Sequence, residues 1–582
     1  MTGGIDRSGA PPAARLPWGR IGVYAGAGVA VLGVPVLLGG SATGFHGVST
    51  DLPTAAVDLG LSFIRMVSAY LLSLGFALLY GYVAASNRVG ERVMIPILDI
   101  LQSVPILGFL PLALVFFVAL TPDSWIGPNL ASIFLIFTSM SWNMVFGVYE
   151  SLKSFPGDLK ESADAFGVTG FQRMRQVVLP ATINRLVYNS VLSWTGGWYF
   201  LVLAEVFSTG KSGVVLPGIG SYLATAAEPW NGNAFLAGLL LLIALIAAMD
   251  LLLWRPLGRW AEKYRYDSSP SGEASEIGEP SGPQRLRRAA GYVSRGVVSS
   301  VSRISAPITT LASRTAGAAP KPGPRTKSAA RYIAIGSVLI VGWLLVIALG
   351  VGVFGVVTGP VRPLVRAQIE TVPLALAFSG GRLLAAYAVS VAIAIPLAVF
   401  LVGRKQAYRV GLPIVEVVAS FPATALFPVF VVALIPYIGF EGVSILMLIT
   451  GMEWYLFFNI LSGVRSIPPD LQEAARAFGL TRWQYYKRLL LPAIVPAFIT
   501  GSITAFGGGW NTLIVAEYFI AKNNTYQVLG IGELIDVGNA AGKAGLPLMV
   551  AALFGMVFTV VAINELFWKP RYRVAVEKFR ID

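Results

Sequence analysis

The stretch ESADAFGVTGFQRMRQVVLPA, residues Glu161–Ala181, returns later in the chain as EAARAFGLTRWQYYKRLLLPA, residues Glu473–Ala493. The two copies lie 312 positions apart and align without a gap. Each copy is polar and lies between long apolar segments. Because self-similarity at a fixed distance is the signature of a repeated structural unit, the chain is expected to contain the same unit twice.

Each copy is predicted to form two short helices with a bend between them. In the second copy, Pro468 opens the first helix, Gly479 ends it as a left-handed C-cap, and Pro492 stops the second helix. Thr481 and Gln484 form a Thr-x-x-Gln capping box at the start of the second helix. The first copy has the same residue types at the corresponding positions. An ordinary loop between two spans would show similar local signals, but it would not be duplicated so closely.

The correspondence between the two halves extends well beyond this loop. Matched residues include Arg65 and Arg382, Ser103 and Ser420, Pro105 and Pro422, Trp198 and Trp510, and Glu205 and Glu517. The halves are not identical, because Tyr199-Phe200 aligns with Asn511-Thr512 and Ser141 aligns with Glu453. A solute that passes between the halves is therefore expected to meet an asymmetric environment.

The composition is that of a polytopic membrane protein. Of 582 residues, 55% are hydrophobic and 13% are charged, and the mean hydropathy is +0.69. Several apolar runs reach the roughly 20 residues that a helix needs to cross a bilayer. The chain has no cysteine and one histidine, His46. This composition excludes disulfides, thiolate nucleophiles and cysteine-based metal sites, and we expect no metal site.

The distribution of Lys and Arg predicts the orientation in the membrane. Apolar segments are expected at 21–39, 57–85, 94–119, 128–149, 183–206 and 234–254, and again at 332–356, 372–401, 411–435, 441–461, 495–520 and 545–568. Lys and Arg gather in the N-terminal tail and the repeated loop, whereas residues 41–56 and 120–127 have none. Because cytoplasmic loops carry the excess of Lys and Arg, both termini and both repeated loops are placed in the cytoplasm.

The fold class is therefore all-α, with about 12 transmembrane helices in two parallel six-helix repeats. The expected parts are a cytoplasmic tail at 1–20, a first unit at 21–266 with its loop at 156–181, a linker at 267–330, and a second unit at 331–582 with its loop at 468–493. Residues 255–331 hold fourteen Lys and Arg against five Asp and Glu. Most of the net charge of +14 therefore belongs to a flexible cytoplasmic linker, and no nucleic-acid partner is needed to explain it.

The repeated loop resembles the EAA loop of ABC-importer permeases, in which a Gly follows the Glu by six positions and a Leu-Pro pair ends the motif. The first copy departs from that pattern only in having Ser162 where the family usually has Ala. The resemblance implies a type I ABC-importer permease fold and a pair of coupling helices that dock on an ATPase subunit. The coupling residues that it implies are Glu161, Ala163, Gly167, Glu473, Ala475 and Gly479.

A second resemblance concerns the segments at 196–205 and 508–517, which are similar to the Trp…Ala-Glu pattern of nitrate/sulfonate/bicarbonate (NitT/TauT-type) permeases. It implies a small anion as the substrate: nitrate, a sulfonate such as taurine, or bicarbonate. It also implies two ABC ATPase subunits and a periplasmic or lipid-anchored substrate-binding protein as partners. Relatives carry one such unit per chain and dimerise, so this single chain is expected to replace a permease dimer.

The chain itself is expected to bind no cofactor and to have no catalytic residues. Gly210-Lys211-Ser212 imitates the end of a phosphate-binding loop, but Glu205 stands where the first glycine of that motif must be. ATP and Mg are therefore assigned to partner ATPase subunits, which would deliver energy through the two loops.

Candidate residues of the translocation pathway are charged, aromatic or helix-breaking residues inside the spans. Arg65 with Glu205, and Arg382 with Glu517, are expected at similar depth, either as buried ion pairs or with the arginines attracting an anion. Trp198 and Trp510 follow Gly pairs and either pack between helices or line the pathway. Ser103-Val104-Pro105 and Ser420-Phe421-Pro422 are expected to kink or unwind their helices, and they are candidates to line a cavity.

The sequence is thus interpreted as an ATP-driven ABC importer permease in a bacterial or archaeal cytoplasmic membrane. Two alternatives stay open. An ion-gradient-driven secondary transporter would need a coupling-ion site and would have no use for two matched loops. A membrane scaffold or sensor would use the loops to bind ATPases without transporting a solute.

Overall fold

The computed structural model describes residues 50–86, 88–103, 105–109, 113–114, 116–117, 120, 126–167, 177–211, 216–227, 230–264, 363–521 and 524–578. These residues belong to one compact unit formed by Gly40–Ser275 and Arg331–Asp582. The predicted N-terminal tail, the first apolar segment of each half, the linker and the capping box of the first loop lie outside the described residues.

The first repeat is built almost entirely from helices. Its elements are α2 (Leu52–Ser86), α3 (Arg88–Ser103), η2 (Ile106–Phe109), α5 (Ile126–Lys153), α6 (Gly157–Ala165), α8 (Leu179–Lys211), α9 (Ile219–Ala227), α10 (Gly232–Met249), η4 (Asp250–Trp254), α11 (Arg255–Ala261) and η5 (Glu262–Tyr264). Within it, α5 packs against both α2 and α8.

The second repeat follows the same plan. Its elements are α14 (Pro363–Glu370), α15 (Val372–Val402), α16 (Lys405–Ser420), η6 (Ala423–Leu426), α17 (Phe427–Arg465), α18 (Pro469–Ala477), α19 (Arg482–Tyr485), η7 (Tyr486–Leu490), α20 (Leu491–Ala516), β1 (Tyr518–Ala521), β2 (Asn524–Gln527), α21 (Ile531–Ala540), η8 (Gly542–Ala544), α22 (Leu546–Ile563), η9 (Asn564–Trp568) and α23 (Lys569–Lys578). Here α17 packs against α15 and α20, as α5 packs against α2 and α8.

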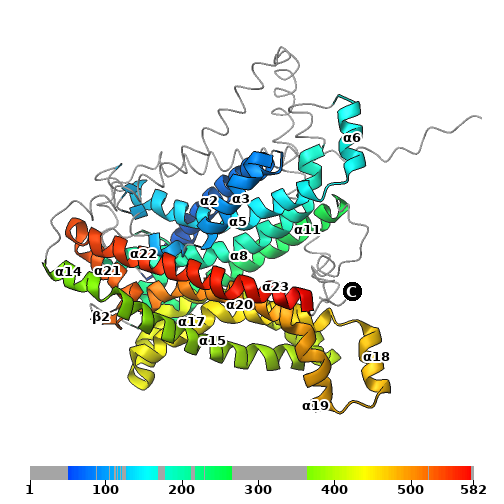
Figure 1. Ribbon diagram of the computed structural model, residues 1–582. Coiled ribbons are helices and arrows are strands. Elements are labelled where there is room, and N and C mark those ends of the chain that lie inside the picture. Colours follow the sequence, from blue (N-terminus) through cyan, green and yellow to red (C-terminus); the bar gives the residue numbers. More distant parts are fainter. Residues whose placement is uncertain are drawn as a thin grey trace, which may run out of the picture. The chain divides into compact units, whose positions relative to one another are not determined.

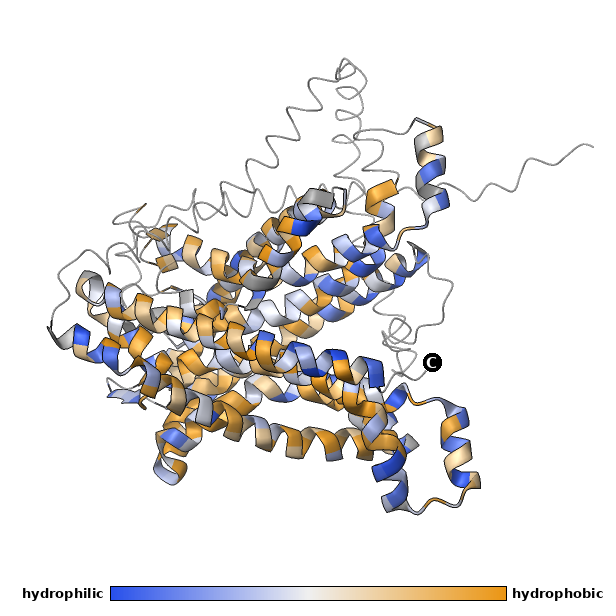
Figure 2. Cartoon of the chain, viewed as in Figure 1, coloured by the Kyte–Doolittle hydropathy of each residue, from blue (hydrophilic) through white to orange (hydrophobic). Residues whose placement is uncertain are grey.

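Seven helical segments among the described residues are long and apolar enough to cross a membrane: Leu52–Ser86, Ile126–Lys153, Gly232–Ala261, Val372–Val402, Ala423–Arg465, Trp483–Ala516 and Leu546–Ala575. Apolar residues dominate these helices in Figure 2, whereas hydrophilic residues gather on α6 and α19. Helix α8 does not meet this criterion although its counterpart α20 does. Near its start α8 has Asn184, Arg185 and Asn189, where the second repeat has Pro, Ala and Gly. The prediction of a polytopic, mostly helical protein is confirmed.

The predicted third span of each half is not one continuous helix. Helix α3 ends at Ser103 and α16 ends at Ser420, and the 3₁₀ turns η2 and η6 follow the buried prolines Pro105 and Pro422. Pro422 itself is extended, with φ −70° and ψ 103°. A proline has no backbone N–H to donate to the carbonyl four residues earlier, and its ring clashes with that carbonyl, so the helix breaks there. The break expected inside the apolar segments 94–119 and 411–435 is therefore confirmed at both prolines.

Close packing between the long helices depends on glycines in the fifth predicted span of each half. A Cβ atom added to Gly509 would overlap Leu383 Cδ1 and would lie 2.9 Å from Met452 Sδ. One added to Gly197 would overlap the side chains of Met140 and Met66. These contacts explain why each Trp of the pattern follows a glycine, since any side chain at the Gly would push the helices apart.

One element was not anticipated from the sequence. Strands β1 and β2 form an antiparallel hairpin directly after Glu517, with Tyr518 opposite Gln527 and Phe519 opposite Tyr526. The Tyr526 ring packs on Phe440 of α17, with ring centroids 5.9 Å apart.

Candidate functional site

The loop of the second repeat has the local structure that its sequence predicts. Helix α18 ends at Ala477, and Gly479, just beyond the C-cap residue Phe478, has a φ of +65°. Gly479 N donates to Arg476 O (2.9 Å) and Leu480 N donates to Ala475 O (3.1 Å). This pair of bonds is the Schellman motif, which satisfies the last carbonyls of the helix and requires a left-handed residue. The predicted C-cap is therefore confirmed.

The capping box that begins α19 is confirmed as well. Thr481 N donates to Gln484 Oε1 (3.0 Å), and Gln484 N donates to Thr481 Oγ1 (3.4 Å). The two side chains thus satisfy two backbone donors that the start of a helix leaves free.

The described part of the first loop has the same form. Phe166 N donates to Ser162 O (3.0 Å), as Phe478 N donates to Ala474 O (2.9 Å) in the second loop, and Gly167 has a φ of +64°. In Figure 1, α6 and α18 each stand clear of the long helices. Nothing lies within 4 Å of a Cβ atom added to either Gly167 or Gly479. Each loop therefore exposes a left-handed glycine turn with open space around it, and we call these two matching turns the glycine corners.

Burial divides the predicted coupling residues into two groups. Ala163 and Ala475 are buried, whereas Glu161 and Glu473 are exposed. Beside each glycine corner stands an aromatic ring, Phe166 at 86% exposure and Phe478 at 83%. Large apolar side chains that remain so exposed at corresponding places are typical of a docking surface. Both phenylalanines lie in the repeated stretch and align with each other, but the sequence pattern alone did not assign them a role.

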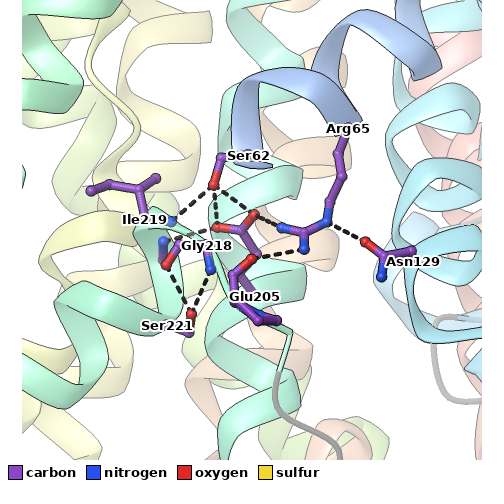
Figure 3. A network of polar contacts seen from close by, with 9 residues as sticks. Ser62, Arg65, Asn129, Glu205, Gly218, Ile219 and Ser221 are labelled. Carbon is purple, nitrogen blue, oxygen red and sulfur yellow. Dashed lines mark hydrogen bonds and ion pairs between the residues drawn. The ribbon is translucent and has the colours of Figure 1, made fainter. Parts of the chain in front are cut away.

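The predicted pairing of Arg65 with Glu205 is confirmed in a buried polar cluster of the first repeat (Figure 3). Arg65 Nη1 donates to Glu205 Oε1 at 2.6 Å. The hydroxyl of Ser62 on α2 donates to the same carboxylate (2.8 Å), as does Gly220 N at the start of α9 (2.9 Å). Glu205 is completely buried, so these donors replace the water that the carboxylate has lost.

The second repeat reproduces this cluster. Arg382 Nη1 donates to Glu517 Oε1 (2.7 Å), Ser379 Oγ donates to the same oxygen (2.6 Å), and Gly532 N donates to Oε2 (2.8 Å). In both repeats the carboxylate therefore sits at the N-terminus of a short helix, α9 or α21, where the helix dipole favours negative charge.

The Gly-Ile-Gly turns at 218–220 and 530–532 enclose these carboxylates. A Cβ atom added to Gly218 would overlap the Glu205 carboxyl, and one added to Gly530 would overlap that of Glu517. The backbone must approach this closely for its N–H groups to reach the buried oxygens, and only glycine allows it.

The other nitrogens of both arginines also donate hydrogen bonds. Arg65 Nε donates to Asn129 Oδ1 (2.7 Å) and its Nη2 donates to Pro217 O (2.7 Å). Arg382 donates through Nε and Nη2 to Glu441 (2.6 and 3.1 Å), and through Nη1 to Leu529 O (2.9 Å). Each guanidinium is thus bound on every nitrogen inside its own cluster. The attraction of an anion by these arginines stays a prediction.

The other predicted pathway residues lie at two places. Trp198 and Trp510 are fully buried, and Trp198 packs edge-on against Trp194, with ring centroids 6.4 Å apart. Pro105 and Pro422 are buried where α3 and α16 break. The side chains of Ser103 and Ser420 lie outside what the structure describes. Whether these residues line a pathway stays a prediction.

A comparison with protein families identifies the two units. The model of the family described as "Binding-protein-dependent transport system inner membrane component" matches residues 77–253 and again residues 388–566. The chain belongs to this family. It is an ABC-type permease that carries two copies of the family's domain.

Curated relatives are permeases of several import systems. The nitrate import permease protein NrtB of Synechococcus elongatus is 26% identical over 155 residues, which cover 26% of this chain and 52% of the relative. The bicarbonate transport system permease protein CmpB of the same organism is 29% identical over 104 residues, covering 18% and 36%. The carnitine transport permease protein OpuCD of Listeria monocytogenes is 26% identical over 191 residues, covering 32% and 81%. The matched residues of the permease cover about half the length of NrtB.

The two repeats of the permease meet along a seam, defined here by η2, η6, α8 and α20. The turn η2 of the first repeat packs on α20 of the second, and η6 of the second packs on α8 of the first. Leu107 N donates to Asn511 Oδ1 (3.4 Å), and Thr424 Oγ1 donates to Tyr199 O (3.2 Å).

A third polar contact crosses the seam. The hydroxyl groups of Tyr199 and Thr512 lie 2.5 Å apart. The sequence had marked Tyr199 and Thr512 only as positions where the repeats differ, and that difference was the one signal that pointed to them. Their contact could not be read from local patterns because 313 positions separate them.

Proposed function

We propose that this permease is the transmembrane subunit of an ATP-driven ABC importer and that it carries a small anion across the membrane. The observation that supports this most is the pair of matching loops at the two repeats. Both end a short helix at a left-handed glycine, with φ +64° and +65°, and both present an exposed phenylalanine beside it. Two identical docking corners suit two ATPase subunits that bind to one chain.

The loops would couple the ATP cycle of the ATPase subunits to movements of the spans. ATPase subunits would enclose Phe166 and Phe478, whose burial would supply most of the docking free energy, since exposed aromatic side chains dominate such contacts. Closure of the ATPases on ATP would draw the loops together and open the spans outward. Hydrolysis would let them return. ATP and Mg would be bound by the partners, and the permease itself would be a transport subunit without an ATPase site.

The proposed setting is a bacterial or archaeal cytoplasmic membrane. The excess of Lys and Arg places the loops, both termini and the linker on the cytoplasmic side. The Arg65–Glu205 and Arg382–Glu517 clusters would then lie toward the outer side, where they hold the start of α9 and α21. A substrate-binding protein would deliver the solute to this outer side.

The substrate class rests on resemblance and on relatives. The relatives named above are described as permeases for nitrate, bicarbonate and carnitine. Nitrate, bicarbonate and sulfonates share a small, flat or tetrahedral group of oxygens with negative charge. We therefore propose an oxyanion, and carnitine is a useful competing substrate in any test.

The test is ATP hydrolysis by the reconstituted complex. The permease is purified with an ABC ATPase and a substrate-binding protein from the same organism, and placed in liposomes with nitrate, bicarbonate, taurine or carnitine. We expect one anion to stimulate ATP hydrolysis and to accumulate inside the liposomes. Uptake driven by an ion gradient without ATP would favour a secondary transporter, and ATPase binding without any uptake would favour a scaffold or sensor.

A variant pair tests the docking surface separately. Replacing both Phe166 and Phe478 by Ala should abolish the association with the ATPase while the permease stays folded. Trp230→Ala is the matched control, because Trp230 is also an exposed aromatic residue, at 53%, and lies outside both loops. Equal ATPase binding by the double variant and the control would show that the loops do not dock the ATPase.

A further inference from the structure

The seam between the two repeats is held by equivalent contacts on both sides. Leu107 and Thr424 occupy corresponding positions in η2 and η6, and Asn511 and Tyr199 occupy corresponding positions in α20 and α8. Leu107 bonds to Asn511, and Thr424 bonds to Tyr199. The broken third span of each repeat is therefore hydrogen-bonded to the fifth span of the other repeat. The repeats cannot separate along the seam without breaking these bonds.

The Tyr199–Thr512 contact is the shortest of the three polar contacts described across the seam, and its direction can be assigned. The Thr512 hydroxyl donates its one hydrogen to Gly508 O (3.0 Å). The Tyr199 hydroxyl is therefore the donor of the 2.5 Å contact, and Thr512 is its acceptor. On the side of α17, the Thr512 hydroxyl packs closely against Gly451, where any Cβ atom would overlap its Oγ1. The contact breaks only if the repeats themselves separate.

The polar groups of the seam are neutral. The buried charged residues among those described are Asp58, Arg65, Glu205, Arg382, Glu453, Glu517 and Asp536. The two cations in this set, Arg65 and Arg382, use all their nitrogens inside their own clusters. An anion that passes between the repeats would therefore have to exchange its water for neutral donors, as buried polar and charged groups must be hydrogen-bonded.

We propose that the hydroxyl groups of Tyr199 and Thr512 form the gate of the translocation pathway and are the groups that bind the oxyanion as it passes. This inference rests on the proposed function as an anion importer. In the closed seam Tyr199 donates to Thr512. When the repeats part, the Tyr199 hydroxyl and the Thr512 hydroxyl, released from Gly508 O, donate to the substrate oxygens. The neighbouring Asn511 amide, which donates to Gly507 O (2.9 Å) in the closed seam, becomes a third donor once it is released. The site is asymmetric because the positions equivalent to Tyr199 and Thr512 are Asn511 and Phe200.

The first experiment measures uptake of nitrate, bicarbonate and taurine by the reconstituted importer with single substitutions. Tyr199→Phe and Thr512→Val each remove one hydroxyl while keeping the shape of the side chain. Losing a hydrogen bond to a charged group should raise the KM for the transported anion about tenfold or more. Thr512→Ser should restore the wild-type KM, because the hydroxyl returns.

The matched control is Tyr387→Phe. Tyr387 Oη lies 2.7 Å from Ser502 Oγ, so this variant also removes a hydroxyl pair between helices, but within the second repeat. Its KM should change less than about twofold. Failure of every anion to be taken up by the wild-type importer would overturn the proposed function and this inference with it. A working wild type in which Tyr199→Phe, Thr512→Val and Tyr387→Phe share one KM would overturn this inference alone.

The second experiment tests the gate directly. Because the permease has no cysteine, Tyr199→Cys and Thr512→Cys together provide the only two thiols. A short, reducible bifunctional thiol reagent should join them and lower uptake well below that of the untreated double variant, while the same treatment leaves each single-cysteine variant at its own untreated level of uptake. Reduction of the cross-link should restore uptake. Full uptake by the cross-linked protein would show that the repeats do not separate at this seam.

Discussion

The two repeats agree most closely in the loops and differ most along the seam. Gly167 and Gly479 have the same left-handed backbone, and an exposed phenylalanine precedes each of them. Along the seam, by contrast, Tyr199 stands opposite Asn511 in the alignment, and Leu107 opposite Thr424. A loop that docks an ATPase subunit, as proposed above, would be used twice in the same way, so both copies would be constrained alike. The seam exists once, and each half can specialise.

The buried ion-pair clusters lie between these extremes. Both keep the Arg, the Glu, the Ser and the two glycines, but the third partner of the Arg is Asn129 in the first repeat and Glu441 in the second. The first cluster instead has Asp58 buried close to Arg65 and Glu205, where the second repeat has Ala375. Each cluster therefore combines one Arg with two carboxylates, although the second carboxylate comes from a different helix.

The largest expected effect is a difference in unfolding free energy between variants of the two clusters. Glu205→Gln removes the carboxylate that faces Arg65 and should cost about 3–5 kcal/mol of unfolding free energy, because a buried guanidinium loses its paired charge. Glu517→Gln should cost less, since Arg382 keeps its double hydrogen bond to Glu441. Thermal unfolding of the purified permease in detergent measures both variants.

The control for this pair is an exposed ion pair of similar length. Arg185 and Glu150 lie 2.8 Å apart, and their side chains are 40% and 57% exposed. Glu150→Gln should change stability by less than about 1 kcal/mol. A smaller loss for Glu205→Gln than for Glu517→Gln would mean that Asn129 or Asp58, rather than Glu205, dominates the first cluster.

The next largest effect tests whether the glycines of the two loops have the same role. Gly167→Ala and Gly479→Ala should each cost about 1–2 kcal/mol locally, because a Cβ disfavours the left-handed backbone although the space around it is open. We expect both variants to fold and to bind the ATPase, yet to hydrolyse ATP without uptake, because the corner that follows the docking helix is distorted.

Gly157→Ala is the control for the loops, because it also lies in open space, at the start of α6, and its φ is not positive. It should keep hydrolysis and uptake coupled. Loss of folding in the Gly167 or Gly479 variants would show that the loop stabilises the membrane domain rather than coupling it to the ATPase.

The parts of this structure that could be predicted from sequence are those whose physics is local. A glycine six positions after the Glu, a Thr-x-x-Gln box and a Pro inside an apolar run each set the backbone within a few residues, and the structure has the C-cap, the box and the helix break at those places. The Arg–Glu pairing followed from depth alone, since an unpaired charge inside a span is costly.

Contacts between distant segments were beyond the reach of these arguments. The Tyr199–Thr512 link depends on how two helices from different repeats cross, and no periodicity in either helix encodes it. The hydrogen bonds from Arg65 to Asn129 and Pro217 likewise depend on three segments that come together only in the folded chain. The β1–β2 hairpin was missed because its eight paired residues lack the alternation that marks a strand.

A smaller effect concerns the start of α19. Thr481→Ala removes the hydroxyl that accepts from Gln484 N, and should cost about 1 kcal/mol of local helix stability. Amide hydrogen exchange over 482–490 should become faster, with little change in the long helices. Ser466→Ala, which removes a hydroxyl bonded to Gly463 O just before this loop, is the control and should leave exchange at 482–490 unchanged. Unchanged exchange in Thr481→Ala would mean that the box does not hold the helix in place.

The smallest effect sharpens the comparison between α9 and α21. Burial raises the pKa of Glu533 above its usual value of 4.5, and the nearby Asp536 adds to this shift while a hydrogen bond from the Gly530 backbone opposes it. The first repeat has Ser221 and Ala224 at the equivalent positions. An acid whose folded pKa is raised binds its proton more tightly in the folded state, so the destabilising effect of Glu533 is absent below pH 4.5 and grows as the pH rises through the folded pKa. Glu533→Gln should therefore stabilise the permease at neutral pH and leave its stability unchanged in acid, as measured by thermal unfolding across a pH series. Ser221→Ala should show no such pH dependence, because no titrating group is removed. A Glu533→Gln variant that is less stable than wild type at neutral pH would mean that the charged carboxylate contributes favourably, as a negative group in the first turn of α21.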